Sequence, residues 1–359
     1  MVPLQVFNAK IASMEIFLLR LDRIGDFVLG VPAFRALRQS YPLDRITVVV
    51  PSAVAELAKA CPYFDEVYLY DAQWLKPGAL PLERWGSALK LVRFLRGKKI
   101  DMLLDFRYQS RLDPLVTGLS GAQMRVGYDL GWVSRFLTLK VAQPLPDAHQ
   151  IERNLHFLQM MGHMATDRRL EMWIGDHDKK IALAHLPKQE LLPGVPRIAV
   201  HLGAAMPSKR WPQDDFSALL HELHVSTQAD LFVLGGEQDA AFAHEVLDGL
   251  QCPAVNLVGK LSLLQMGALL EHCRVFIGCD SGATHVAAAC GTPVVSLFSA
   301  ANEVEVWKPW GDKVKVLTRY PECSPCKAYE CQRTDGYFCM AEIGVEEVVT
   351  AVKDSLKRD

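Results

Sequence analysis

The sequence predicts an α/β protein built from two doubly wound domains. Short apolar runs of four to seven residues alternate with stretches of helical spacing, which is typical of β-α units around a parallel sheet. The alternation starts near residue 15 and starts again at Arg197. Because 359 residues are too many for one typical hydrophobic core, the two stretches are interpreted as two domains.

In the first half, apolar runs are expected to form strands and two longer stretches are expected to form helices. The expected strands are Glu15–Leu21, Ile46–Val50, Glu66–Tyr70 and Ile100–Phe106. The expected helices are Val28–Ser40 and Arg84–Arg96, and the second has Trp85, Leu89, Val92 and Leu95 on one stripe.

The second half shows the same alternation. The expected strands are Arg197–Leu202, Asp230–Leu234, Val255–Val258, Val275–Gly278 and Val294–Phe298. Helices are expected to begin near Gln213, Asp239, Ser262 and Ala283.

The two halves are joined by a proline-rich connection over residues 143–196, which holds a predicted helix at Glu152–Met161. We therefore expect an N-terminal domain over residues 1–165 and a C-terminal domain over residues 166–340. A terminal helix within residues 341–359 is expected to pack toward the N-terminal domain. Residues 1–12 are expected to form a loose extension.

The composition is that of a globular protein, with 50% hydrophobic and 22% charged residues, which excludes disordered and fibrous classes. The net charge of −2 hides a split: residues 1–165 hold 20 Lys and Arg against 15 Asp and Glu, and the rest hold 19 against 26. Opposite signs indicate different roles for the two domains. No nucleic-acid partner is expected.

Targeting signals are not evident. There is no run of about 20 apolar residues, so no membrane span is expected. The N-terminus lacks a basic start and Glu15 interrupts its apolar run, so it is a poor secretion signal. The nine cysteines fit mostly free thiols in a reducing cytoplasm.

The first candidate site follows the first predicted strand. Gly25 allows a tight turn, and Asp26 lies at or near the N-cap of the next helix. Asp26 is either a plain helix cap or a general base that takes a proton from a hydroxyl group. The local sequence does not separate the two, although Arg20 and Arg23 add charge at the same strand end.

The second candidate site follows the strand that opens the second half. Gly203 begins a loop that carries Lys209 and Arg210 just before Trp211-Pro212. A cation in a loop between strand and helix suits a phosphate, whereas a lone Lys-Arg pair is more often only solvated. Neither a Walker loop nor a GxGxxG fingerprint is present.

The third candidate site, from Asp280 to His285, again lies between a strand and a helix. Ser281 and Gly282 leave the first N–H groups of that helix uncovered, and such a helix end attracts anions. His285 lies one turn inside the helix. The alternatives are a serine cap at Ser281 and a core histidine at His285.

Together these segments resemble the heptosyltransferases of glycosyltransferase family 9, over roughly residues 14–350. The resemblance rests on Gly25-Asp26 with Val31-Pro32-Ala33, Lys209-Arg210-Trp211-Pro212, Gly235-Gly236-Glu237 and Asp280-Ser281-Gly282 with His285. It implies a GT-B glycosyltransferase, in which two Rossmann-like domains face a central cleft. It also implies inverting transfer, without a catalytic cofactor, of heptose from ADP-L-glycero-D-manno-heptose to a sugar hydroxyl of the lipopolysaccharide inner core.

The resemblance also implies residue roles. Asp26 is implied to be the general base, and Lys209 the catalytic residue that holds the diphosphate. Arg20 and Arg23 are expected to bind the acceptor. The implied donor contacts are Glu237 at the ribose, Asp280 at the donor sugar, and Ser281, Gly282, Ala283 and His285 at the phosphates.

A basic stretch from Arg84 to Arg111 gives the first domain its positive charge. Such a surface suits a phosphorylated glycolipid held in a membrane, and the alternative is a solvated basic helix. A cytoplasmic protein associated with the inner face of the inner membrane is therefore expected.

Four cysteines cluster late in the chain, with the first two in metal-ligand spacing. Four thiolates can hold a tetrahedral Zn or Fe ion, so a structural metal without a catalytic role is a hypothesis here. A related group of heptosyltransferases that act on autotransporter proteins is similar in carrying a cysteine-held iron. Free thiols or one disulfide are the alternatives. The cysteines are Cys323, Cys326, Cys331 and Cys339.

Two other functions remain open at the level of sequence. One is a heptosyltransferase or related glycosyltransferase whose acceptor is a protein or another glycan. The other is a non-catalytic module that only binds a nucleotide sugar. An epimerase on the same frame would need further acid–base groups that the sequence does not indicate.

Overall fold

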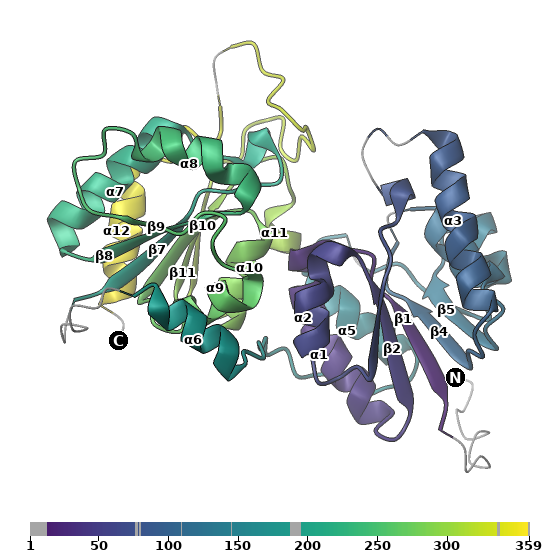
Figure 1. The fold of residues 1–359 in the computed structure, drawn as a ribbon. Helices are drawn as coiled ribbons and strands as arrows, with labels where there is room; N and C mark the ends of the chain where they lie inside the picture. The colour runs from purple at the N-terminus through teal and green to yellow at the C-terminus, as the bar shows by residue number, and fades with distance from the viewer. Residues whose placement is uncertain are drawn as a thin grey trace. The chain divides into compact units, whose positions relative to one another are not determined.

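The computed structural model describes residues 13–75, 78, 80–108, 110–144, 146–186, 195–335 and 338–357. The chain divides into two compact units, residues 1–168 (unit 1) and residues 169–359 (unit 2), shown in Figure 1. The boundary lies three residues beyond the predicted one. The loose extension expected over residues 1–12 lies outside the described residues.

Unit 1 is a sheet of six parallel strands with helices on its faces (Figure 1). The strand order is β3-β2-β1-β4-β5-β6. The strands are β1 (Glu15–Leu19), β2 (Arg45–Val50), β3 (Glu66–Leu69), β4 (Met102–Asp105), β5 (Met124–Tyr128) and β6 (Leu139–Val141). The helices are α1 (Ile24–Ser40), α2 (Ala55–Ala60), α3 (Pro81–Arg96), α4 (Leu112–Leu119) and α5 (Gln150–Met160), with short 3-10 turns η1 (Ser52–Val54), η2 (Gln73–Leu75) and η3 (Gly131–Phe136).

Unit 2 has a second parallel sheet of six strands, in the order β12-β11-β10-β7-β8-β9. The strands are β7 (Arg197–His201), β8 (Asp230–Leu234), β9 (Val255–Asn256), β10 (Val275–Cys279), β11 (Val294–Phe298) and β12 (Val314–Thr318). The helices are α6 (Asp176–Ala184), α7 (Gln213–Thr227), α8 (Ala240–Leu247), α9 (Leu263–Leu270), α10 (Gly282–Ala289), α11 (Val304–Trp307) and α12 (Val345–Leu356), with 3-10 turns η4 (Pro207–Lys209) and η5 (Glu237–Asp239).

The central strands form the cores because parallel strands are covered on both faces. The side chains of Ile16, Leu18 and Val48 in unit 1, and of Val200 and Ile277 in unit 2, are fully buried. This explains why these strands read as continuous apolar runs. In each unit the strand order, counted from the start of that unit, is 3-2-1-4-5-6.

Strands β5, β6 and β12 were not among the predicted strands, and two predicted helices differ in detail. Helix α1 begins at Ile24 rather than Val28, so Asp26 lies inside its first turn and is not the N-cap. In α3 the side chains of Trp85 and Leu89 are 51% and 60% exposed. The buried face of α3 is formed instead by Ser87, Ala88, Leu91, Val92 and Leu95.

The terminal helix α12 belongs to unit 2. It packs against α7 and approaches β10 and β11. The side chains of Val348, Ala351 and Val352 are fully buried in the core of that unit. The apolar face of α12 is therefore covered within unit 2, and the expectation that this helix packs toward the N-terminal domain stays a prediction.

None of the helices in the described part of the chain is long and apolar enough to cross a membrane.

The packing of α12 predicts a specific loss of stability. Val352→Ala removes two buried methyl groups and leaves a cavity, so the free energy of unfolding should fall by about 2 kcal/mol. Thr350→Ala, at an exposed position of the same helix, should change it by less than about 0.5 kcal/mol. Urea denaturation of both variants measures the difference, and equal effects would contradict the packing of α12.

Candidate functional site

The predicted site residues gather at the same point of each sheet. In a sheet of this order, the connections that leave the two central strands run in opposite directions, and ligands bind beyond the carboxyl ends of those strands. The central strands are β1 and β4 in unit 1, and β7 and β10 in unit 2. Asp26 follows β1, Lys209 follows β7 and Asp280 follows β10.

Arg20 is buried in unit 1, although its guanidinium was expected to bind the acceptor. Its Nη2 donates to the carbonyl oxygen of Asp26 at 2.7 Å, and its Nη1 lies 3.2 Å from Oδ2 of Asp22. Its guanidinium carbon lies 5.7 Å from the ring centroid of Phe34. The group therefore holds the first turn of α1 in place. Arg23, which is exposed, is better placed to meet an acceptor.

Asp26 itself is half-buried in the first turn of α1. Its Oδ2 accepts a hydrogen bond of 3.3 Å from the backbone N–H of Arg23. One carboxylate oxygen thus caps the helix while the side chain stays within reach of solvent. The capping role and the proposed role as a base are compatible.

Arg107 is a central residue of this site that the sequence analysis did not single out. It follows β4, the strand that pairs with β1. Its Nη1 donates to Oδ1 of Asp22 at 2.5 Å and to the carbonyl oxygen of Leu21 at 2.8 Å. Its Nε donates to Oδ2 of Asp113 at 3.1 Å. Its position directly after the predicted strand Ile100–Phe106 was the signal that could have identified it.

The pKa of Asp26 is raised to about 6. Burial is the main cause, and the negative charge of Asp22 adds to it. The guanidinium groups of Arg20 and Arg107 and the N–H of Arg23 oppose the rise. Asp26 is therefore mostly ionised at pH 7 and yet basic enough to accept a proton efficiently.

A second carboxyl group of unit 1, that of Asp105, also has a raised pKa. Burial, helped by the charge of Asp113, raises the pKa of Asp105 to about 8. Its Oδ1 is 3.1 Å from the backbone nitrogen of Arg107, and its Oδ2 is 3.0 Å from the hydroxyl of Thr117. Asp105 is thus mostly protonated at pH 7. The guanidinium groups of Arg20 and Arg107 contact Asp22 and Asp113 instead.

In unit 2, the structure brings together Lys209 and Asp280, which were predicted from separate segments. Nζ of Lys209 lies 2.6 Å from Oδ2 of Asp280, and the side chains are only 9% and 7% exposed. The amide of Asn302, which follows β11, donates to the same carboxylate oxygen at 3.1 Å. The sequence analysis missed Asn302.

A second ion pair lies beside the first. Nη2 of Arg210 donates to Oδ1 of Asp239 at 3.0 Å, and Asp239 is buried. A side chain at position 203 would meet Oδ2 of Asp239 at 2.3 Å, so only glycine fits there. Glu237, the acid expected at the ribose, is exposed at the start of η5. Asp239 is a structural partner of Arg210 that the sequence analysis did not identify.

Helix α10 begins at Gly282, with Ser281 as its N-cap residue. The Oγ atom of Ser281 makes no cap bond to the helix backbone and lies 3.3 Å from Oγ1 of Thr284. Thr284 donates to the carbonyl oxygen of Cys279 at 2.6 Å, which joins the helix to β10. Ala283 and His285 are buried in the first turns. The start of α10 therefore lies directly beside Asp280, as predicted.

The segment 326–329 connects the two loops that carry the partners of Asp280. The backbone N–H and the hydroxyl of Ser208 donate to the carbonyl oxygens of Tyr329 and Ala328, at 3.1 and 2.6 Å. On the other side, the N–H of Cys326 donates to the carbonyl oxygen of Ala300 at 3.1 Å. Lys209 follows Ser208, and Asn302 lies two residues beyond Ala300. One segment thus positions both loops.

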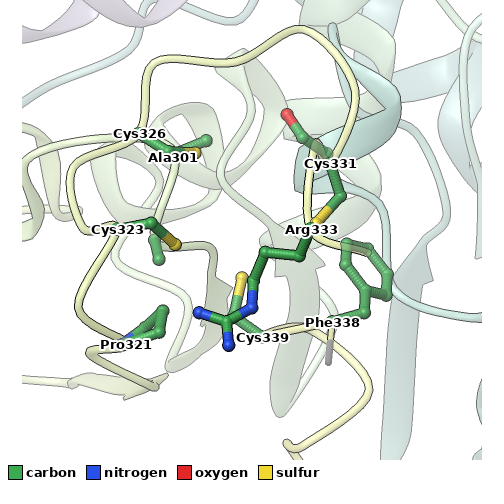
Figure 2. A pocket seen from close by; sticks show the side chains of 10 residues that line it. Ala301, Pro321, Cys323, Cys326, Cys331, Arg333, Phe338 and Cys339 are labelled. Carbon is green, nitrogen blue, oxygen red and sulfur yellow. The ribbon is translucent and has the colours of Figure 1, made fainter. Parts of the chain in front are cut away.

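The four clustered cysteines line one pocket of unit 2, and the side chain of Arg333 extends into it (Figure 2). Among the described residues, none of the four forms a disulfide bond. Across the described residues, no group of three or more His, Cys, Asp or Glu side chains is arranged to hold a metal ion. The guanidinium of Arg333 also brings positive charge to the place where a cation would bind. The hypothesis of a structural Zn or Fe ion at Cys323, Cys326, Cys331 and Cys339 is not supported by this arrangement.

The sequence model of glycosyltransferase family 9 (heptosyltransferase) matches residues 88–335, which is more than half of the chain. The chain belongs to glycosyltransferase family 9. It is 27% identical over 350 residues to lipopolysaccharide heptosyltransferase 3 of Escherichia coli K12, covering 93% of this chain and 96% of that protein.

Solved structures support the fold of this family 9 glycosyltransferase. A family 9 glycosyl transferase from Veillonella parvula superposes with a TM-score of 0.79 at 21% identity, covering 96% of this chain and 98% of the other. The E. coli ADP-heptose lps heptosyltransferase II superposes with a TM-score of 0.73 at 21% identity, covering 96% and 99%. The predicted GT-B class and the predicted family are both confirmed.

Arg107 is expected to be essential to the stability of this glycosyltransferase. Arg107→Met leaves Asp113 and Asp22 buried with less compensation, so the free energy of unfolding should fall by about 3–5 kcal/mol. Arg84→Met, at an exposed position of the same unit, is the control and should cost less than about 0.5 kcal/mol. Urea denaturation at pH 7.5 compares the two, and equal stabilities would show that the buried ion pairs are not needed.

Proposed function

We propose that this glycosyltransferase transfers a heptose from ADP-L-glycero-D-manno-heptose to a sugar hydroxyl of the lipopolysaccharide inner core, with inversion. The observation that carries the proposal is the half-buried Asp26, a base with a raised pKa where the connection to α1 leaves the central strands. The buried pair of Lys209 and Asp280 lies at the corresponding point of unit 2. The proposed donor and acceptor are those named for the related E. coli proteins, an ADP-heptose lps heptosyltransferase and a lipopolysaccharide heptosyltransferase.

In the proposed reaction, Asp26 takes the proton from the acceptor hydroxyl. The oxygen then forms a bond to the anomeric carbon of the donor while the bond from that carbon to the diphosphate breaks. The proton remains on Asp26 and ADP leaves with the electron pair. A single displacement of this kind inverts the anomeric centre, and it needs one base.

The donor is proposed to bind in unit 2. Negative charge grows on the leaving oxygen, and Lys209 with the first N–H groups of α10, at Gly282 and Ala283, supplies positive charge for it. One such donor is commonly worth about 3 kcal/mol of the barrier. Asp280 keeps Lys209 in place and contacts the donor sugar.

The remaining contacts complete the proposal. Ser281 and His285 are assigned to the phosphates, and the exposed Glu237 to the ribose hydroxyls. Arg23 is assigned to the acceptor, and Arg20 acts as a positioning residue through the backbone of Asp26. Because Asp26 and the donor residues lie on different units, the reaction requires both units to act on one pair of substrates.

Replacing the base tests the reaction. Asp26→Asn keeps the shape of the side chain but removes its basicity, so ADP release with ADP-heptose and a deep-core acceptor should fall about 10²- to 10⁴-fold. Binding of ADP, measured by calorimetry, should be unchanged. Asp147→Asn, at an exposed aspartate of the same unit, is the control and should keep full turnover.

Three outcomes of that experiment separate the alternatives. Full turnover by Asp26→Asn would refute the assigned base. ADP binding without turnover by the unmodified protein would favour a nucleotide-sugar binding module. A sugar added to a protein rather than to lipopolysaccharide, seen as a mass shift, would change the acceptor.

The pH dependence follows from the same carboxylate. Because only ionised Asp26 can accept the proton, kcat/KM should fall about tenfold per pH unit below about pH 6. The steady-state rate of ADP release between pH 4.5 and pH 8.5 measures this limb. An acidic limb near pH 4, the ordinary pKa range of an exposed aspartate, would show that burial does not raise the pKa of Asp26.

A further inference from the structure

Helix α3 presents an unusual outer surface. Leu82, Trp85 and Leu89 are 84%, 51% and 60% exposed, although their side chains are large and apolar. Leu80, just before the helix, is 63% exposed. The opposite face of α3 is buried in the core of unit 1, so the helix is fixed and its outer stripe points away from that core.

The exposed stripe continues as a basic surface. Leu82, Trp85, Leu89, Arg93 and Arg96 follow one another at intervals of three and four residues, which places them on one face of the helix. The segment 80–99 contains six Lys and Arg residues and one acid, Glu83. The carboxylate of Glu83 accepts the N–H of Leu80 at 3.0 Å, so it serves as a helix cap.

We propose that the outer face of α3 docks on the surface of an anionic lipid bilayer. Leucine and tryptophan side chains enter the boundary between headgroups and acyl chains, and arginine and lysine side chains attract negatively charged headgroups. The helix lies in the plane of the interface and does not cross the bilayer. This inference is independent of the proposed transfer reaction, since it uses none of the residues assigned to it.

The charge of the α3 surface indicates which kind of partner binds there: a second copy of the chain, a nucleic acid or a lipid bilayer. A second copy of this chain would offer a surface of the same positive sign, with Arg93 and Arg96 on the same face, so no charge attraction favours that pairing. A purely electrostatic partner such as a nucleic acid would make no use of the exposed leucines. A bilayer with anionic lipids uses both the apolar and the basic parts.

Vesicle flotation tests the proposal with the full-length protein. The protein should float with vesicles of phosphatidylglycerol and phosphatidylethanolamine, and should not float with phosphatidylcholine vesicles. Binding should weaken strongly at roughly 0.5 M salt because the headgroup attraction is screened. Trp85→Phe should remove part of the fluorescence blue shift that accompanies vesicle binding.

Matched variants distinguish lipid binding through α3 from nonspecific lipid binding by other exposed leucines. Leu82→Ser with Leu89→Ser should lower the lipid partition coefficient roughly tenfold or more, because two apolar side chains no longer enter the interface. Leu43→Ser with Leu183→Ser changes two leucines that are exposed elsewhere, at 88% and 44%, and should leave binding unchanged. ADP affinity should be the same in both double variants, which verifies that they are folded.

The proposal is overturned if the protein ignores anionic vesicles, or if the two double variants bind alike. It is also overturned if binding appears only when the vesicles carry the phosphorylated glycolipid, because the surface would then be an acceptor site. Loss of transfer by Asp26→Asn with normal vesicle binding would leave it intact, so its failure and that of the transfer reaction are distinguishable.

Discussion

The strand order 3-2-1-4-5-6 is the constraint on which both units depend. The connections that leave the central strands diverge, so space is left between them at the carboxyl edge of the sheet. The residues that follow β1, β4, β7 and β10 must fill or line that space, and in this chain they are charged. The same topology thus prepares a polar site in each half, and the local residues give the two sites different chemistry.

Buried charge is tolerated at these points only because each group has a partner. In unit 1 the guanidinium groups of Arg20 and Arg107 pair with Asp22 and Asp113, and the buried carboxyl group of Asp105 is favoured in its neutral form. In unit 2 Asp280 is paired with Lys209, and the pair holds the ammonium group of the lysine at a fixed place in the site. The acidic net charge of the second half therefore does not prevent an anion from binding, because the field at the site is set by a few fixed groups.

The fold and family could be predicted from the sequence because buried parallel strands leave continuous apolar runs. Asp26, Lys209 and Asp280 lie in the loops or the helix starts that follow such runs. Arg107 could have been found from its position after the strand Ile100–Phe106. The ion pairs of Arg107 and the roles of Asp239 and Asn302 could not be predicted, since pairing depends on which strands become neighbours. Strands β5 and β6 were missed because Met124–Tyr128 carries an arginine and a glycine, and Leu139–Val141 is short and largely exposed. The outward face of α3 was misassigned because Trp85 and Leu89 are apolar but are not buried.

The segment 326–329 couples the positions of two loops in unit 2. It is bonded to the loop of Ser208 on one side and to the loop of Ala300 on the other, and these loops supply the lysine and the amide that meet on one oxygen of Asp280. Lys209 and Asn302 are therefore held through the same segment and have little freedom to move separately. A displacement of segment 326–329 would therefore shift the lysine and the amide together relative to Asp280.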